Sequence, residues 1–334
     1  MSRIETKWYD DWVEENIEDL TGKVAIVTGA NSGTGFWASN ALAAKGCHVV
    51  LACRNEEKAK AAQSEILKKF PEAKLTFIPL DNNSFQSVSA FAKVFQEKFD
   101  RLDILLNNAG IMGKPWTITN DGYDIQLQTN HLSHFLLTKL LWDKMVSTPG
   151  QSRVVQHSSS GHKMGKLKFD PNRLKNPGFS AGFLGSNYLF VNTIGRFMGL
   201  TADWKRYSVS KLANVLFMRE LQRKISSNNM EDKIISLSCH PGWADTNLPN
   251  TSTGKLGKYL KNNPQKGQSA ADGSLPLLMA AVGKNVENGD YLGPENGMTG
   301  APKKDKVGGN GNDVEMAKTL WEFSEKAIKE KFDI

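Results

Sequence analysis

Tyr207 and Lys211 are two side chains of complementary chemistry that stand four residues apart in the segment Tyr-Ser-Val-Ser-Lys. The apolar residues of 208–225 recur with helical spacing, and residues four apart on a helix share one face. An ammonium close to a phenol favours the phenolate, so it lowers the pKa of the phenol from its usual value of about 10. The spacing therefore predicts a proton-transfer pair.

A glycine-rich turn at residues 29–35, Gly-Ala-Asn-Ser-Gly-Thr-Gly, is the second chemical feature. It follows the β-branched run Val24–Thr28 and precedes a helical pattern that continues through Lys45. Glycines let such a turn close tightly and bring backbone N–H groups to a pyrophosphate, while the helix N-terminus adds a favourable dipole. The turn predicts a phosphate-binding site, with GxxxGxG spacing in place of the GxGxxG of two-domain dehydrogenases.

The remaining elements must hold these two features together. From Lys23 onward short apolar runs alternate with longer helical patterns, which predicts one doubly wound, Rossmann-type α/β domain with a parallel sheet and helices on both faces. The predicted strands are Val24–Thr28, Val49–Cys53, Leu75–Leu80, Ile104–Asn107, Arg153–Ser158 and Ile234–Cys239. Ser84 is expected to cap a helix, Asn130–Met145 to form another, and 312–332 to form a closing helix behind an Asn312 cap.

Composition narrows the class of protein. The 334 residues are 40% hydrophobic, which is ample for a sizeable core. Three cysteines without a CxxC pair, and a start without a signal-peptide pattern, favour a soluble cytoplasmic protein with free thiols. The net charge of +7 is spread along the chain, and its densest run, at 303–306, is interpreted as a solvated loop, so no nucleic-acid partner is expected.

Four motifs together carry a family resemblance. They are TGANSGTG at the glycine turn, NNAG at 107–110, YSVSK at 207–211 and HPG at 240–242, in this order. The chain resembles the short-chain dehydrogenases/reductases from about Asp19 to Ser324. It looks most similar to their retinol-dehydrogenase-like branch, given DGYDIQLQTNHLSHFLLT, HPGWADTNL, the Gly-Pro at 293–294 and KTLWEFSE.

The resemblance implies a catalytic set of Asn130, Ser159, Tyr207 and Lys211. In this set Tyr207 is the acid/base, the Ser159 hydroxyl bonds the substrate oxygen, and the Asn130 amide helps to hold the lysine and a relay water. Ser158 is the alternative to Ser159, because three serines follow one another here. The reaction implied is hydride transfer between a nicotinamide and a carbonyl or alcohol.

The cofactor site is implied in the same way. The expected binding residues are Gly29, Asn31, Ser32, Gly33, Thr34, Gly35, Arg54, Asp81, Asn82, Asn108, Ala109, Gly110, Tyr207, Lys211, Pro241, Gly242 and Thr246. Asp81 would face the adenine, Asn108 the adjoining ribose region, and Thr246 the nicotinamide amide. Asn82 stands where the family usually has an apolar residue.

Arg54 decides which nicotinamide cofactor is expected. An acidic side chain at the end of the second strand would bind the ribose 2′-hydroxyl of NAD, but Cys53 and Arg54 stand here. A guanidinium can pair with the 2′-phosphate of NADP through charge-assisted hydrogen bonds. The sequence therefore predicts NADP(H).

Three segments lie outside the family pattern or interrupt it. Residues 1–20 form an N-terminal extension, 163–206 an insertion, and 247–267 a Gly/Asn/Lys-rich loop expected over the substrate. The insertion contains aromatic residues among glycines, which predicts a lid over a bulky hydrophobic substrate such as a retinoid, carotenoid fragment, steroid or fatty aldehyde. A subunit interface in a homodimer and a peripheral membrane contact are the alternatives.

Some features of the sequence would suit functions other than that of a reductase. The GxSxG at 178–182 would suit a hydrolase only between a strand and a helix, and the preceding residues are loop-like. His131 and His134 lack the glutamate of a zinc motif and are interpreted as packing and solvent contacts, so no metal is expected. A protochlorophyllide-reductase-like enzyme is the alternative within the family, because Ser159 and Tyr207 are far apart in the chain. A non-catalytic NADPH sensor is the alternative outside the enzymes.

Overall fold

A single mixed sheet forms the centre of the computed structural model, which describes residues 4–167, 202–252 and 255–334. Its eight strands lie in the order β3-β2-β1-β4-β5-β6-β7-β8, and all neighbours are parallel except the last pair. The strands are β1 Val24–Thr28, β2 His48–Cys53, β3 Leu75–Pro79, β4 Ile104–Asn107, β5 Ser152–His157, β6 Ile234–Cys239, β7 Tyr291–Pro294 and β8 Pro302–Asp305. The predicted Rossmann-type fold is confirmed.

Strands β7 and β8 were not predicted from the sequence. Each has only four residues. β7 is buried but ends in Gly-Pro, and β8 reads Pro-Lys-Lys-Asp with two exposed lysines, so neither has the β-branched pattern of the predicted strands. Lys303 and Lys304, interpreted above as part of a solvated loop, are exposed but belong to this antiparallel edge strand. Charged residues are typical of sheet edges because they discourage pairing with another chain.

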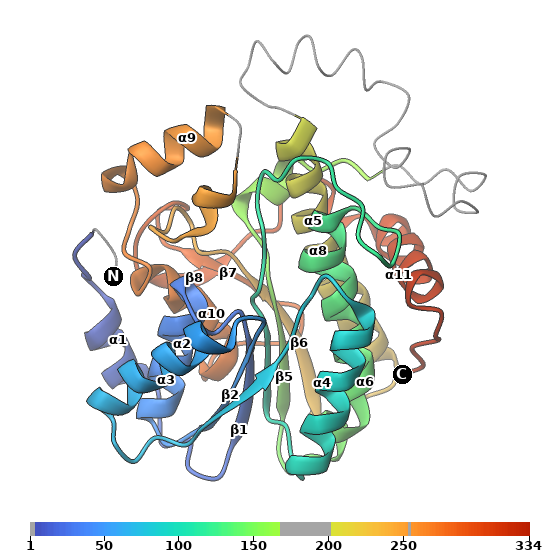
Figure 1. Ribbon diagram of the computed structural model, residues 1–334. Coiled ribbons are helices and arrows are strands. Elements are labelled where there is room, and N and C mark those ends of the chain that lie inside the picture. The colour runs from blue at the N-terminus through green and yellow to red at the C-terminus, as the bar shows by residue number, and fades with distance from the viewer. Residues whose placement is uncertain (1–3, 168–201, 253–254) are drawn as a thin grey trace.

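Helices cover both faces of the sheet (Figure 1). The core on one face includes residues of α1 Tyr9–Asn16, α2 Gly33–Ala44, α3 Glu56–Lys69 and α10 Leu275–Val282. The core on the other includes residues of α4 Phe85–Lys98, α6 Ser133–Ser147, α8 Ala202–Ser227 and α11 Val314–Ile328. Shorter helical elements are α5 Ile125–Leu127, η1 Gln128–Leu132, η2 Ser160–Met164, η4 Leu248–Thr251, α9 Lys255–Asn262, η5 Pro264–Lys266, η6 Asp272–Ser274 and η7 Gly309–Asn312.

The helix starts agree in part with the sequence. Ser84 caps α4 by accepting a hydrogen bond from the Ser87 N–H, as expected. The closing helix is capped by Asp313, which accepts from the Met316 N–H, so the expected Asn312 cap was wrong. Asn130 lies in the π-helical turn η1, before α6 rather than within it. Turns of this kind are often found at functional sites.

The N-terminal extension is part of the core. Its helix α1 is anchored by the buried carboxylate of Asp272, which accepts the backbone N–H groups of Lys7, Trp8 and Tyr9 at 2.9–3.2 Å. Asp272 also accepts the Ser269 hydroxyl. The first residues therefore pack against the same face as α2 and α10.

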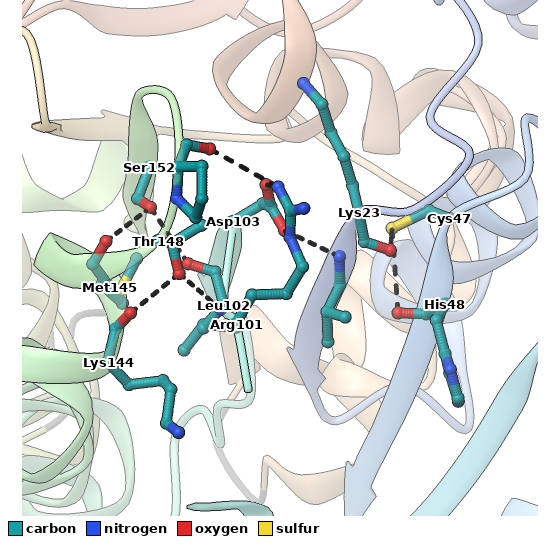
Figure 2. Close-up of polar contacts among 12 residues, drawn as sticks. Lys23, Cys47, His48, Arg101, Leu102, Asp103, Lys144, Met145, Thr148 and Ser152 are labelled. Atoms are coloured by element: carbon teal, nitrogen blue, oxygen red, sulfur yellow. Dashed lines mark hydrogen bonds and ion pairs between the residues drawn. The ribbon is translucent and has the colours of Figure 1, made fainter. Parts of the chain in front are cut away.

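The edge of the sheet where β4 begins is closed by local polar contacts (Figure 2). Arg101 donates two hydrogen bonds to Asp103, at 2.9 and 2.7 Å, and Asp103 also accepts the Val24 N–H. The Thr148 hydroxyl accepts the Leu102 N–H. These contacts lie at the amino-terminal ends of β1 and β4. Ligands of open α/β sheets bind at the opposite ends, where the loops after the strands diverge.

Acid stability is expected to depend on buried histidines. Burial lowers the pKa of all six, and it brings that of His131 to about 3 and that of His134 to about 4. Below the usual histidine pKa of about 6.5 the unfolded chain binds protons that the folded protein does not, so stability falls as pH decreases. Each fully buried histidine contributes roughly 1.4 kcal/mol per pH unit.

We expect the melting temperature to fall steadily from pH 7 to pH 5, as measured by calorimetry in one salt concentration. Replacing His134 by Gln removes one titrating group and should reduce that slope. A melting temperature that is flat over this range would contradict the assignment of neutral buried imidazoles.

Candidate active site

A cavity of about 600 Å³ lies at the carboxyl ends of the strands. The glycine turn and Arg54 line one part of it, and Ser159, Tyr207 and Lys211 line another. Every position expected to bind the cofactor lines this cavity except Gly35, which packs behind the turn. The two features predicted from the sequence thus share one site.

The glycine turn makes close backbone contacts. Gly29 and Gly33 have φ of +68° and +58°, which side chains rarely adopt. A Cβ on Gly35 would lie 2.5 Å from both the Gly29 carbonyl oxygen and Asn108 Nδ2, and one on Gly33 would lie 3.2 Å from Thr246 Cγ2. Glycine is therefore required at residue 35, where the turn packs on Gly29 and Asn108, and at residue 33, where Thr246 packs on the turn.

Asn108 cross-links three elements. Its Oδ1 accepts the Thr34 hydroxyl at 3.0 Å and pairs with His157 Nδ1 at 2.7 Å, and its Nδ2 donates to the Thr28 carbonyl at 2.8 Å. The sequence placed Asn108 toward the ribose, and Thr34 among the cofactor contacts. Both residues line the cavity, and their polar side chains also join β1, the glycine turn and β5.

Arg54 and Asp81 lie together at the outer part of the cavity. The Arg54 side chain is 70% exposed, and its Nη1 stands 3.8 Å from the Asp81 carboxylate. Both line the cavity, where a phosphate can reach the guanidinium. An exposed pair at this distance holds the arginine only weakly, so the guanidinium is free to take another anion.

Asn82 directs its side-chain amide into the protein. Its Nδ2 lies 2.9 Å from His134 Nε2 and 3.3 Å from the Thr129 carbonyl. Asn82 nevertheless lines the cavity, so its place among the cofactor-binding residues stays a prediction. His131 and His134 are fully buried, so the solvent contacts expected for them were wrong.

Ser159 and Tyr207 form the centre of the catalytic geometry. Both side chains line the cavity, and the interaction of the Ser159 hydroxyl with the Tyr207 phenol acts to lower the pKa of that phenol. By contrast, Ser158 is buried and donates its hydroxyl to the Lys211 carbonyl at 2.8 Å. Both serines line the cavity, but the Ser158 hydroxyl is engaged by the backbone of α8, whereas the Ser159 hydroxyl interacts with the Tyr207 phenol.

Lys211 is held beneath the phenol. Its Nζ donates to the His157 carbonyl at 2.8 Å and lies 5.9 Å from the centre of the Tyr207 ring. The Asn214 amide donates to the same carbonyl at 3.0 Å. His157 is a functional position that sequence reasoning missed, because it acts through its backbone oxygen and through a ring bond to Asn108.

Burial dominates the protonation of this pair. It raises the pKa of Tyr207 to about 12, against a smaller lowering by the Ser159 hydrogen bond, and it lowers the pKa of Lys211 to about 8. The sequence led us to expect a phenol pKa lowered by the ammonium. Because desolvation outweighs that attraction, Tyr207 is a neutral phenol at pH 7 and can donate a proton to an oxygen in the cavity.

Asn130 is bonded differently from the expectation. Its Oδ1 accepts the Ile111 N–H at 2.8 Å, and its Nδ2 donates to the Ile111 carbonyl and to Ser210 Oγ. Lys211 bonds His157 instead. A Cβ on Gly110 would lie 3.2 Å from Asn130 Oδ1 and 3.3 Å from Lys211 Nζ, so Gly110 permits this close packing.

The remaining wall of the cavity is apolar. Met112, Trp204 and Tyr207 form a buried cluster on which Leu248, Leu256 and Leu260 pack. The segment 247–267, read from the sequence as a loop, contains the helix α9, which contributes Leu256 and Leu260 to the cavity. Trp204 is one of the aromatic residues of the insertion at 163–206.

Only the two ends of the insertion, 163–167 and 202–206, are among the described residues. The expected lid, with Phe179, Phe183, Tyr188, Phe190 and Phe197, lies outside them, as does the GxSxG at 178–182. At the second end, Arg206 is 3% exposed and pairs with Asp124 at 3.1 Å and Asp203 at 2.5 Å. Asp124 caps α5, so this ion pair joins the start of α8 to the segment that leads to Asn130.

Comparisons with known proteins agree with this geometry. A family model described as short chain dehydrogenase matches residues 23–170. The short-chain dehydrogenase/reductase drtF of Aspergillus calidoustus is 31% identical over 94% of this chain and 96% of its own. The chain therefore belongs to the short-chain dehydrogenases/reductases, a family of oxidoreductases.

Solved structures share the fold. An uncharacterised protein of Mycobacterium paratuberculosis, 28% identical, superimposes with a TM-score of 0.73 over 96% of this chain and 98% of its own. L-Sorbose reductase of Gluconobacter frateurii, solved with NADPH and L-sorbose, is 18% identical, with a TM-score of 0.60 over 84% of this chain and 97% of its own. Within the described ranges, no helix is long and apolar enough to cross a bilayer.

The Arg206–Asp124 pair is expected to be important for stability. Arg206→Met leaves a buried carboxylate without its cation and should lower the free energy of unfolding by about 3–5 kcal/mol in urea titration. Adding Asp124→Asn removes the unpaired charge and should recover a large part of that loss. A single variant within about 1 kcal/mol of the wild type would mean that the pair is solvated.

Proposed function

We propose that this protein is an NADPH-dependent reductase that transfers a hydride between the nicotinamide and a carbonyl or alcohol of a bulky hydrophobic substrate. Within the family we place it nearest to the retinol-dehydrogenase-like branch. The observation that carries the proposal is that Ser159, Tyr207 and Lys211 line one cavity with the glycine turn, with the Lys211 ammonium 5.9 Å from the centre of the Tyr207 ring.

The residues of the cavity suit a dinucleotide phosphate. The tight turn at Gly29 and Gly33 leads into the N-terminus of α2, whose N–H groups and dipole attract a pyrophosphate. Arg54 would take the 2′-phosphate, and the loop from Pro241 to Thr246 would take the nicotinamide end. When bound, the cofactor supplies the hydride.

The protein supplies the proton. In reduction, the neutral Tyr207 phenol gives its proton to the carbonyl oxygen while Ser159 donates a hydrogen bond that orients that oxygen. Lys211, with a pKa of about 8, is largely protonated at pH 7 and lowers the energy of the phenolate that remains. In the reverse direction the phenolate accepts the proton of the alcohol.

The substrate class follows from the apolar wall. Met112, Leu248, Leu256 and Leu260 offer no charged group to a substrate, and such walls are typical of sites for hydrophobic molecules. We assign residues 163–206 as the lid over that substrate. A contact with a second subunit or with a membrane surface is the competing assignment for the same segment.

Tyr207→Phe tests the reaction. With NADPH and a series of hydrophobic aldehydes and ketones, the variant should lose at least about a hundredfold in kcat while binding NADPH normally, because it lacks only the proton donor. Tyr123→Phe is the matched control, since that phenol bonds the Ala327 carbonyl away from the cavity. Equal turnover by the wild type and Tyr207→Phe would refute the assignment.

Arg54→Ala tests the cofactor. Loss of a charged hydrogen bond should weaken NADPH binding roughly tenfold or more, whereas NADH, which lacks the 2′-phosphate, should bind as to the wild type. Fluorescence titration with both cofactors measures the ratio. An unchanged preference would place the 2′-phosphate elsewhere.

A further inference from the structure

His240 is a buried imidazole to which the mechanism above gives no role. Its Nε2 lies 3.0 Å from the Asp305 carboxylate, and its Nδ1 accepts the Gly242 N–H at 3.2 Å. Since Nδ1 is an acceptor, the proton of the neutral ring is on Nε2 and is donated to Asp305. The ring therefore bridges the edge strand β8 and the backbone of the loop after β6.

The surroundings leave this ring one orientation. It stacks on Tyr291 with centroids 5.4 Å apart and planes at 22°. A Cβ on Gly293 would lie 2.1 Å from His240 Nε2, so only glycine leaves space for the imidazole. Asp305 is held in turn, because its second oxygen accepts the Lys306 N–H at 2.7 Å.

The bridged loop is itself tightly packed. Gly242 has φ of +63°, and a Cβ there would lie 2.2 Å from the Met298 carbonyl oxygen, which also accepts the Trp243 N–H. The loop continues to Thr246, which contacts the glycine turn at Gly33. A change in direction of the Gly242 N–H would thus displace backbone that lines the cavity.

We propose that His240 and Asp305 are positioning residues that hold the loop 241–246 in the shape that receives the nicotinamide end of the cofactor. The inference rests on the proposed function, because it assumes that this cavity binds NADPH. In this proposal the β7–β8 hairpin affects affinity for the nicotinamide end of the cofactor. It does not affect the adenosine end, where Arg54 lies.

Binding at the nicotinamide end and at the adenosine end of the cofactor site can be measured separately with two ligands. Isothermal titration should be carried out with NADPH and with adenosine 2′,5′-bisphosphate, which carries the phosphates of the adenosine end but no nicotinamide. For His240→Leu we expect roughly tenfold weaker NADPH binding, the size of one lost buried hydrogen bond. Binding of the bisphosphate should remain within twofold of the wild type.

Conservative variants sharpen the test. The amide oxygen of His240→Asn can take the place of Nδ1 and accept the Gly242 N–H, so it should retain more NADPH affinity than His240→Gln, whose amide reaches the Nε2 position instead. Asp305→Ala should also weaken NADPH selectively. His48→Asn, which removes a histidine at the start of β2, five strands away from β7 in the sheet, should change the affinity for neither ligand.

The outcomes distinguish the two proposals. If the wild type binds neither ligand, the proposed function fails before any variant is considered. If the wild type binds both and His240→Leu binds NADPH normally, the positioning role is refuted. The role is equally refuted if His240→Leu loses both ligands to the same extent, because the ring would then be a general support of the fold.

Discussion

The end of strand β5 is the junction on which the site depends. The His157 carbonyl accepts both Lys211 and Asn214, and its ring pairs with Asn108, which in turn holds the glycine turn through Thr34. One residue thus connects the phosphate-binding turn to the catalytic lysine. Because the sheet is parallel here, the ends of β1, β4 and β5 meet at the same edge, and a single buried residue can reach both halves.

Desolvation determines the proton states around this junction. The phenol and the ammonium are both shifted toward their neutral forms, and the buried histidines are neutral for the same reason. A neutral phenol is a proton donor, which is the state that the proposed reduction of a carbonyl requires. The hydrogen bond that Lys211 donates to the His157 carbonyl compensates in part for the burial of the ammonium.

The last third of the chain closes the sheet and supplies part of the cavity wall. Strand β8 closes the sheet as an antiparallel edge, Asp305 on it reaches His240, and the loop after β6 lies between this hairpin and the glycine turn. Helix α9 then adds Leu256 and Leu260 as an apolar wall. The cofactor half and the substrate half of the cavity are therefore both bounded by segments with little strand or helix pattern in the sequence.

The sequence by itself was enough to predict the fold, because six short strands and the glycine turn at 29–35 are recognised by local spacing. The same kind of spacing made Tyr207 and Lys211 a candidate pair. The sequence left Ser158 and Ser159 as alternatives, and their difference depends on which hydroxyl α8 covers. It did not indicate that the amides of Asn82 and Asn108 bond groups that are distant in the chain. These hydrogen-bond partners come together only when the helices pack on the sheet. The same packing sets the balance of desolvation and charge at Tyr207, so only the tertiary structure decided both.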